Sequence, residues 1–142
     1  MIESWTQGTV MKKILFVCVG NACRSQMAEG FTKKYGSPME IEAFSVGTMP
    51  AAAIDPMTVR VMAETGIDVT GYCPKPIDGE HLVEFDRIIS MGPGVRETCP
   101  FLIIRERAED WGIRDPVGRG LDFFRKTRDE IRDRVLAMLE FI

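Results

Sequence analysis

The sequence predicts an α/β fold, a three-layer sandwich in which a four-stranded parallel sheet carries helices on both faces. Three observations lead to this prediction. Strand-like and helix-like segments alternate along the whole chain, the first strand-like segment is apolar almost throughout, and the last segment has a clear helical period. Parallel strands are joined by helical crossovers, and strands covered on both faces are apolar on both faces.

Composition is consistent with a single domain. The chain has 142 residues, of which 45% are hydrophobic, enough for a substantial core. The formal charge of −3 argues against nucleic-acid binding through overall positive charge, so any bound anion must be held by a local site. The apolar runs fall short of the roughly 20 residues that span a bilayer, so we expect no membrane partner.

Four cysteines are too few and too scattered to form a disulfide framework in a chain of this size. We therefore expect a cytoplasmic protein with reduced thiols. Residues 1–11 precede the first apolar run, and we predict that they form a flexible N-terminal extension. The domain itself is predicted to span residues 12–142.

The first three elements are predicted from residues 12–47. Residues 12–19, KKILFVCV, form a near-continuous apolar run that predicts a buried strand. From Ser25 the chain is rich in helix formers, and Gly36 is the expected C-cap of that helix. Residues 41–47 predict the second strand. Ligands of such folds bind beyond the carboxyl ends of the strands, where residues 18–24 follow the first strand.

The middle of the chain supplies a capped helix and a third strand. Asp55 stands directly before Pro56, which suits a helix N-cap and first helical position, and Gly66 is a plausible stop. A short helix is expected over about 78–84. The apolar residues of 85–91, FDRIISM, then predict the third strand.

The C-terminal third ends in a long helix. Prolines and glycines in 92–100 predict a loop with at most one helical turn, and a fourth short strand is expected within 101–113. From about 121 to 142, apolar residues recur at spacings of three or four, which predicts an amphipathic helix with a Glu130–Arg134 ion pair on its surface.

The stretch from Cys18 to Phe31, CVGNACRSQMAEGF, carries the predicted chemistry. A cysteine beside a helix N-terminus and a cation is favoured as the reactive thiolate. Arg24 offers a planar fork to two oxygens of a tetrahedral oxyanion, and Ser25 can donate a hydrogen bond to the sulfur. Backbone N–H groups of such a loop converge on an anion. The predicted oxyanion-binding residues are Val19, Gly20, Asn21, Ala22, Cys23 and Arg24.

A thiolate nucleophile also needs an acid to protonate its leaving group. Asp115 is the candidate, because Pro116 restricts the backbone that presents it, although an Asp-Pro pair is also common in turns. A simpler interpretation of Cys18 is a buried apolar residue at a strand end. One histidine and this cysteine spacing match no zinc pattern, so no metal is expected.

These motifs resemble the low-molecular-weight protein tyrosine phosphatase superfamily, which includes the thioredoxin-coupled arsenate reductases. The resemblance extends from Lys12 to the C-terminal helix and includes SVGT at 45–48 and ETGIDV at 64–69. It implies that Cys18 is the nucleophile and Arg24 the oxyanion clamp, and that Asp115 is the acid. Asn21 and Ser25 would shape the loop and stabilise the thiolate.

Within that superfamily the chain is more similar to the arsenate reductases. Gln26 after the loop serine, Trp111 before Asp-Pro and Val117-Gly118 in place of a tyrosine pair all agree with that branch. Such reductases take part in arsenic resistance. No bound cofactor is expected, and thioredoxin or a small-molecule thiol would act as the reductant.

The reductase resemblance is incomplete at the thiols that accept oxidising equivalents. Thioredoxin-coupled members use two cysteines separated by six residues, and here Cys99 matches the second while Gly92 occupies the first. Cys99 is the expected second thiol, with Cys73 or an external thiol as substitutes. Cys23, inside the loop, would be buried or protective.

Three functions therefore stay open. The leading one is reduction of arsenate to arsenite through Cys18. The alternative is hydrolysis of phosphate monoesters through a phosphocysteine, and the non-enzymatic alternative is an oxyanion or redox sensor.

Overall fold

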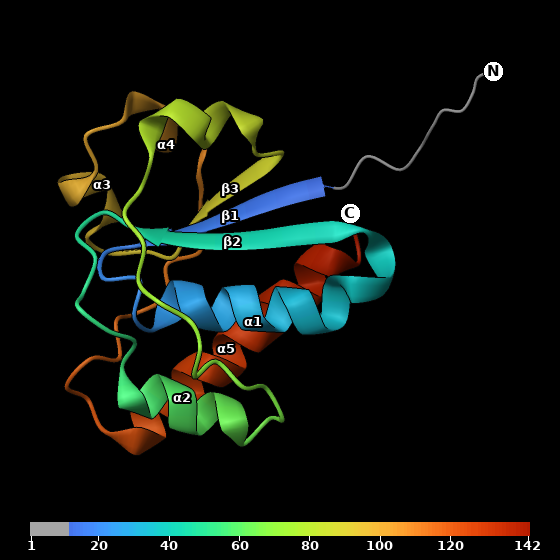
Figure 1. The fold of residues 1–142 in the computed structure, drawn as a ribbon, viewed down its shortest axis with the longest axis vertical. Helices are drawn as coiled ribbons and strands as arrows, with labels where there is room; N and C mark the ends of the chain where they lie inside the picture. Colours follow the sequence, from blue (N-terminus) through green and yellow to red (C-terminus); the bar gives the residue numbers. More distant parts are fainter. Residues whose placement is uncertain (1–11) are drawn as a thin grey trace.

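The computed structural model describes residues 12–142, and the predicted flexible extension over residues 1–11 lies outside this range. Its centre is a four-stranded parallel sheet with strand order β2-β1-β3-β4, which confirms the predicted sheet (Figure 1). The strands are β1 (Lys12–Cys18), β2 (Ile41–Gly47), β3 (Arg87–Ser90) and β4 (Glu109–Asp110).

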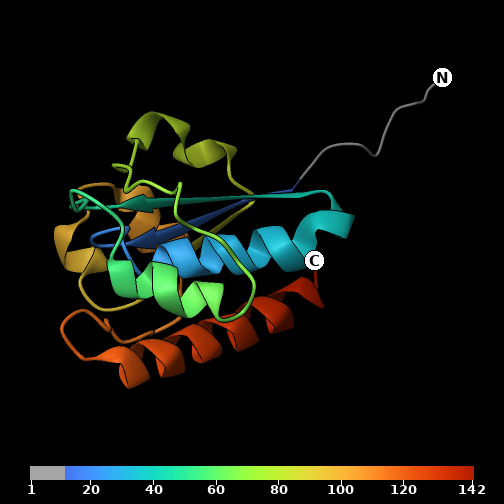
Figure 2. The same ribbon diagram turned by 60° about the horizontal axis from the view of Figure 1, so that its bottom comes forward.

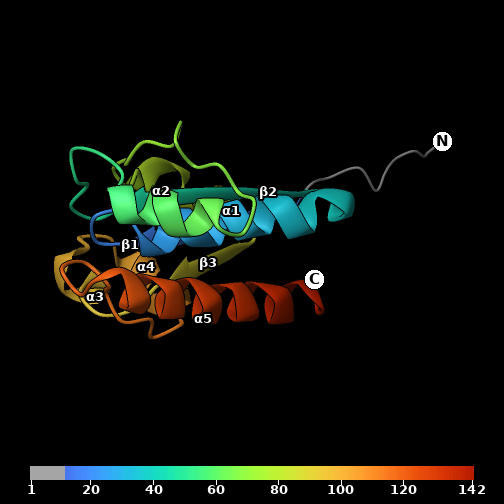
Figure 3. The same cartoon turned by 90° about the horizontal axis from the view of Figure 1, so that it is seen from below.

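Helices cover both faces of the sheet, as Figure 2 shows. On one face lie α1 (Arg24–Gly36), α2 (Pro56–Ala63) and α5 (Leu121–Leu139), and Figure 3, which views this face, shows α5 running alongside α1. The other face carries η3 (Gly79–Glu84), α3 (Val95–Thr98) and α4 (Leu102–Arg107). A short turn of helix, η2 (Ser37–Met39), joins α1 to β2. Within residues 12–142, none of the helices is long and apolar enough to cross a bilayer.

The central strand β1 divides the core in two. Ile14, Phe16 and Cys18 point into a large apolar cluster under α1, α2 and α5, whereas Leu15 and Val17 point into a smaller cluster under η3, α3 and α4. Alternate side chains of a strand project to opposite faces, so a strand buried on both faces is apolar at every position. This is the physical basis of the apolar run in the sequence.

Several element boundaries differ from the predictions. Asp55 does cap α2, accepting a hydrogen bond from the Met57 N–H at 2.9 Å. The predicted C-cap at Gly36 is wrong: its φ is −92°, and Glu40 adopts the left-handed conformation instead, with φ of 54°. A Cβ at Gly36 would lie at an ordinary contact distance of 3.5 Å from the Ile41 and Leu139 side chains. The third strand is shorter than predicted, and the fourth has only two residues.

The predicted surface ion pair on α5 is also wrong. In the described residues 12–142, Arg134 does not pair with Glu130 but lies over the Trp111 ring at 5.0 Å and donates to the Trp111 carbonyl at 3.2 Å. The cation–π contact and the carbonyl bond fix the segment that leads to Asp115 against α5.

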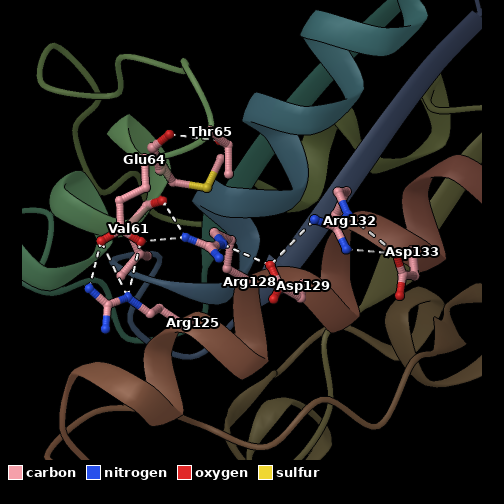
Figure 4. A network of polar contacts seen from close by, with 9 residues as sticks. Val61, Glu64, Thr65, Arg125, Arg128, Asp129, Arg132 and Asp133 are labelled. Atoms are coloured by element: carbon pink, nitrogen blue, oxygen red, sulfur yellow. Dashed lines mark hydrogen bonds and ion pairs between the residues drawn. The ribbon is translucent and has the colours of Figure 1, made fainter.

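Charged residues on α5 instead connect it to α2. Figure 4 shows the Glu64 carboxylate between two arginines of α5, with Arg128 Nη1 at 2.6 Å and Arg125 Nη2 at 2.8 Å. Hydrogen bonds from these guanidinium groups lower the pKa of Glu64 to about 2. The pairs join two helices that are neighbours on the same face of the sheet.

Candidate active site

Cys18, the last residue of β1, lies at the edge of the sheet where the carboxyl ends of the strands meet. The chain turns through residues 19–23 and enters α1 at Arg24. A cavity of about 200 Å³ opens at this turn. Its lining residues are Cys18, Val19, Gly20, Ala22, Cys23, Arg24, Ala51, Asp115 and Val117. The structure therefore brings the predicted nucleophile, the predicted oxyanion clamp and the predicted acid to one cavity.

The Cys18 sulfur is held by two groups of the loop. The Asn21 N–H donates to Sγ at 3.1 Å, and the Ser25 hydroxyl oxygen lies 2.8 Å from Sγ. Asn21 Nδ2 donates to the same hydroxyl oxygen at 2.7 Å. Because a hydroxyl has one hydrogen and the amide occupies an acceptor site on the oxygen, the hydroxyl hydrogen is free to point at the sulfur. Both groups stabilise a negatively charged sulfur.

Of the two parts expected of Asn21, oxyanion binding and shaping the loop, its contacts fit the second. It is fully buried and does not line the cavity, and its N–H is used on the sulfur rather than on an oxyanion. Its φ of 52° places it in the left-handed region, which asparagine tolerates better than most residues. The side chain is fixed by the Lys75 N–H at 2.7 Å and by Ser45 Oγ at 3.0 Å. Asn21 therefore fixes the shape of the loop.

The polar contacts of Asn21 continue away from the sulfur. Ser45 Oγ donates to Glu29 Oε1 at 2.5 Å, and Glu29 in turn pairs with Lys33 Nζ at 2.6 Å. Glu29 is only 6% exposed, and these two partners hydrogen-bond its buried side chain. The predicted SVGT segment contributes to the site through Ser45.

The segment after β2 orients the backbone of the loop. N–H groups of 48–55 donate to loop carbonyls: Thr48 to Cys18 at 3.0 Å, Met49 to Val19 at 2.8 Å and Ala51 to Gly20 at 2.9 Å. Since a peptide N–H points opposite to its carbonyl, carbonyls drawn outward turn the loop N–H groups toward the cavity. These N–H groups and the N-terminus of α1 form an anion-binding concavity.

Arg24 is 2% exposed and its guanidinium is held by backbone carbonyls. Nη1 donates to the Ile113 carbonyl at 3.0 Å and makes a longer contact of 3.5 Å with the Pro93 carbonyl. Both contacts use Nη1, which leaves Nε and Nη2 for a ligand in the cavity. Neither carbonyl could be predicted from local sequence, because the two lie in loops 69 and 89 residues away from Arg24.

Asp115 is presented from the loop before α5. Its Oδ1 accepts a hydrogen bond from the Val117 N–H at 3.1 Å, a turn of the Asp-Pro type that the sequence also allowed. The carboxyl is exposed and lines the cavity with Cys18. This turn holds the Asp115 carboxyl at the cavity, which is compatible with the predicted acid role.

Ala51 and Val117 line the cavity and were not among the predicted site residues. The sequence singles out Val117 only because Val117-Gly118 stands in place of the tyrosine pair of the phosphatases. Ala51 and Val117 are both small and aliphatic, so the cavity lining supplied by residues 12–142 has an apolar edge and no aromatic ring.

Two of the four cysteines, Cys18 and Cys23, line the cavity. Cys23 lines the cavity as a buried residue, and burial raises its pKa to about 12, so it is a neutral thiol. Cys99 is 2% exposed and lies in the smaller core cluster, on the other side of the sheet from the cluster that contains Cys18. Cys73 is exposed. The structure does not bring Cys99 or Cys73 to the cavity lining.

Comparisons with known proteins show the family of this chain. The fold and the cavity define a cysteine-based enzyme, and the chain belongs to the low molecular weight phosphotyrosine protein phosphatase family, whose family model matches residues 13–142.

Relatives with this similarity carry two kinds of name. A glutaredoxin arsenate reductase of Synechocystis sp. is 40% identical over 88% of this chain and 94% of its own length. An arsenate reductase of Staphylococcus epidermidis is 36% identical over 87% and 93%. Among solved structures, an arsenate reductase in the phosphate binding state is 38% identical, with a TM-score of 0.79 over 92% of this chain and 98% of that one. A tyrosine phosphatase from T. tengcongensis is 26% identical, with a TM-score of 0.78 over 92% and 99%.

Proposed function

We propose that this protein reduces arsenate to arsenite at Cys18. The observation that carries the proposal is the meeting of Cys18, Arg24 and Asp115 on one cavity of about 200 Å³. This volume is below the roughly 300–1,000 Å³ of pockets for larger organic ligands, and it suits a small oxyanion. The names of the relatives that are 36–40% identical support arsenate as that oxyanion.

The first step is attack of the Cys18 thiolate on arsenic. Arg24 and the loop N–H groups hold the arsenate oxygens, which orients the ion and balances its charge. A sulfur–arsenic bond forms and one arsenic–oxygen bond breaks, and the departing oxygen takes a proton from Asp115 and leaves as water. Arsenic remains in its pentavalent state on Cys18.

The second step needs another thiol. We propose Cys99 for it: its thiolate attacks Cys18 Sγ, and the electron pair of the sulfur–arsenic bond leaves with arsenic, which is released as trivalent arsenite. A Cys18–Cys99 disulfide results. For Cys99 to reach Cys18, the four residues of α3 that precede it must unwind, since its N–H is bonded to the Val95 carbonyl at 2.9 Å.

An external reductant restores the enzyme. Two equivalents of a small thiol, or one reduced thioredoxin, convert the protein disulfide back to two thiols and leave with one disulfide of their own. Both reductants occur in the reducing cytoplasm, where we expect this protein to act. Glutaredoxin is a third donor to test, because it appears in the name of a relative.

Phosphate-ester hydrolysis is the second candidate function. Gly92 stands where the resemblance places the first relay cysteine, and an enzyme without a relay can still form a phosphocysteine on Cys18. Asp115 would then protonate the leaving alcohol and afterwards activate water. The aliphatic edge formed by Ala51 and Val117 offers no stacking surface for an aryl group, which favours arsenate over aromatic esters.

The decisive comparison assays purified protein with arsenate plus each thiol donor and, in parallel, with an aryl phosphate. We expect arsenite to accumulate and the Cys18→Ser variant to lose all turnover. Fast aryl phosphate hydrolysis without arsenite would establish the phosphatase instead. Oxyanion binding with neither activity would establish a sensor.

A further inference from the structure

Gly92 occupies a position that only glycine fits. It is buried where the chain leaves β3, and its φ of +137° lies in a region that other residues rarely adopt. A Cβ at this position would lie 2.8 Å from the Ile113 nitrogen and 2.9 Å from the Ile113 oxygen. Both atoms belong to the backbone, so they cannot rotate away as a side chain would.

The backbone that passes so close to Gly92 is the backbone that holds Arg24. The Ile113 N–H donates to the Met91 carbonyl at 2.7 Å, which joins the two loops on the N-terminal side of Gly92. The Ile113 carbonyl then accepts from Arg24 Nη1 at 3.0 Å. On the C-terminal side of Gly92, the Pro93 carbonyl makes the longer contact with the same nitrogen. Gly92 thus lies at the crossing of the two segments that supply both carbonyls.

We propose that Gly92 is a positioning residue for Arg24. By lacking a side chain it lets the Ile113 carbonyl approach, and that carbonyl holds Nη1 of the guanidinium while Nε and Nη2 stay available to a ligand. The inference rests on oxyanion binding at the proposed site and is independent of whether reduction or hydrolysis follows.

The proposal also gives a reason for the incomplete thiol relay. A cysteine at position 92 would place its Cβ against the Ile113 backbone, so the single change Gly92→Cys would displace the carbonyl that holds Arg24. This position supports the oxyanion clamp here and cannot carry a thiol in the same backbone geometry.

The test separates the guanidinium from the sulfur. Inorganic phosphate binding to Gly92→Ala, measured by calorimetry, reports the clamp. The rate at which iodoacetamide, an uncharged reagent, alkylates Cys18 reports the thiolate, which is held by Asn21 and Ser25 instead. We expect phosphate affinity to fall by about 10- to 100-fold, the value of a hydrogen bond to a charged group, while alkylation in the absence of phosphate keeps its wild-type rate.

Gly120→Ala is the matched control. Gly120 also has a positive φ, of +91°, but a Cβ there would meet no atom within 4 Å. It introduces backbone strain without a clash, so we expect wild-type phosphate affinity. Wild-type phosphate affinity in folded Gly92→Ala would overturn the proposal, and so would equal losses of affinity in both variants.

A second variant keeps the test decisive if Gly92→Ala does not fold. Incorporation of an α-hydroxy acid at position 114 converts the Ile113 carbonyl from an amide to an ester, which is a weaker acceptor, and leaves Gly92 untouched. The reference protein carries the amino acid with the same side chain at 114. Weaker phosphate binding in the ester protein supports the role of this carbonyl, and equal binding refutes it. Neither readout depends on arsenate, so failure of the reductase proposal would be seen separately.

Discussion

The Ser25 hydroxyl lies 2.8 Å from the Cys18 sulfur, and Asn21 Nδ2 donates to the same hydroxyl oxygen at 2.7 Å. The amide thereby favours the orientation in which the hydroxyl hydrogen points at sulfur. Asn21, in the left-handed conformation, joins the two ends of the loop by bonding both the Cys18 sulfur and the Ser25 hydroxyl.

Removing that hydroxyl should slow the chemistry of the sulfur. We expect Ser25→Ala to lower the rate of Cys18 alkylation by iodoacetamide at pH 7 by about 10- to 100-fold, because a hydrogen bond to a charged group is lost. Ser37→Ala changes an exposed serine outside the site and should alkylate at the wild-type rate. An unchanged rate in Ser25→Ala would mean that the hydroxyl does not stabilise the thiolate.

Asp115→Asn tests the general acid. We expect turnover to fall by roughly 10²- to 10⁴-fold, since proton donation to the leaving group is lost. With a series of phosphate esters, the loss should be largest for the poorest leaving groups, while the affinity for inorganic phosphate should not weaken. Equal losses across the series would argue that Asp115 acts in some other way.

Cys23 should be unreactive despite its place beside the nucleophile. Burial raises its pKa to about 12, so it becomes a thiolate only in strongly alkaline solution. When the folded protein is treated with iodoacetamide at pH 7 to 9, peptide mass spectrometry should find Cys18 and the exposed Cys73 alkylated and Cys23 intact. Early labelling of Cys23 would contradict its assignment as a neutral thiol.

Cys99→Ser tests the second thiol. We expect this variant to stop releasing arsenite with thioredoxin as the reductant, while phosphate-ester hydrolysis continues, because only the reductive step needs another sulfur. Arsenite release at the wild-type rate would show that an external thiol attacks Cys18 directly. Loss of both activities would point to a packing role in the smaller core cluster.

The Glu64 ion pairs make a prediction about acid stability. The pKa of Glu64 is lowered from 4.5 to about 2 in the folded protein, so its contribution to stability is complete above pH 4.5 and is lost as the pH falls to about 2. Glu64→Gln should therefore lower the Tm at pH 7, and the difference from wild type should shrink below pH 4.5. A Tm difference that persists at pH 2 would exclude the charge as its cause. Glu140→Gln, at the end of α5, is the control.

The sequence allowed the sheet and the loop to be predicted because both depend on local patterns. An uninterrupted apolar run identifies β1, and Cys18, Arg24 and Ser25 lie within one turn and one helix start. The Ile113 carbonyl could not be predicted, since its approach to Arg24 depends on how two distant loops cross.

The partners of surface side chains could not be predicted from the sequence either. The i,i+4 spacing predicts a Glu130–Arg134 pair. In the folded protein the Arg134 guanidinium instead contacts the Trp111 ring and donates to the Trp111 carbonyl. The role of Gly92 likewise depends on backbone that is distant in the sequence. In the sequence it is a missing cysteine, and only the backbone of Ile113 beside it explains why glycine stands there.

The central claim is that Cys18 supplies electrons to arsenate, and a single-turnover reaction tests it most directly. Reduced enzyme is mixed with excess arsenate in the absence of any other thiol, then arsenite is quantified and the oxidised cysteines are mapped by mass spectrometry. The account predicts one arsenite for each protein chain, with Cys18 found in a disulfide. A Cys18 that stays a free thiol, with no arsenite even after a thiol donor is added, would contradict it.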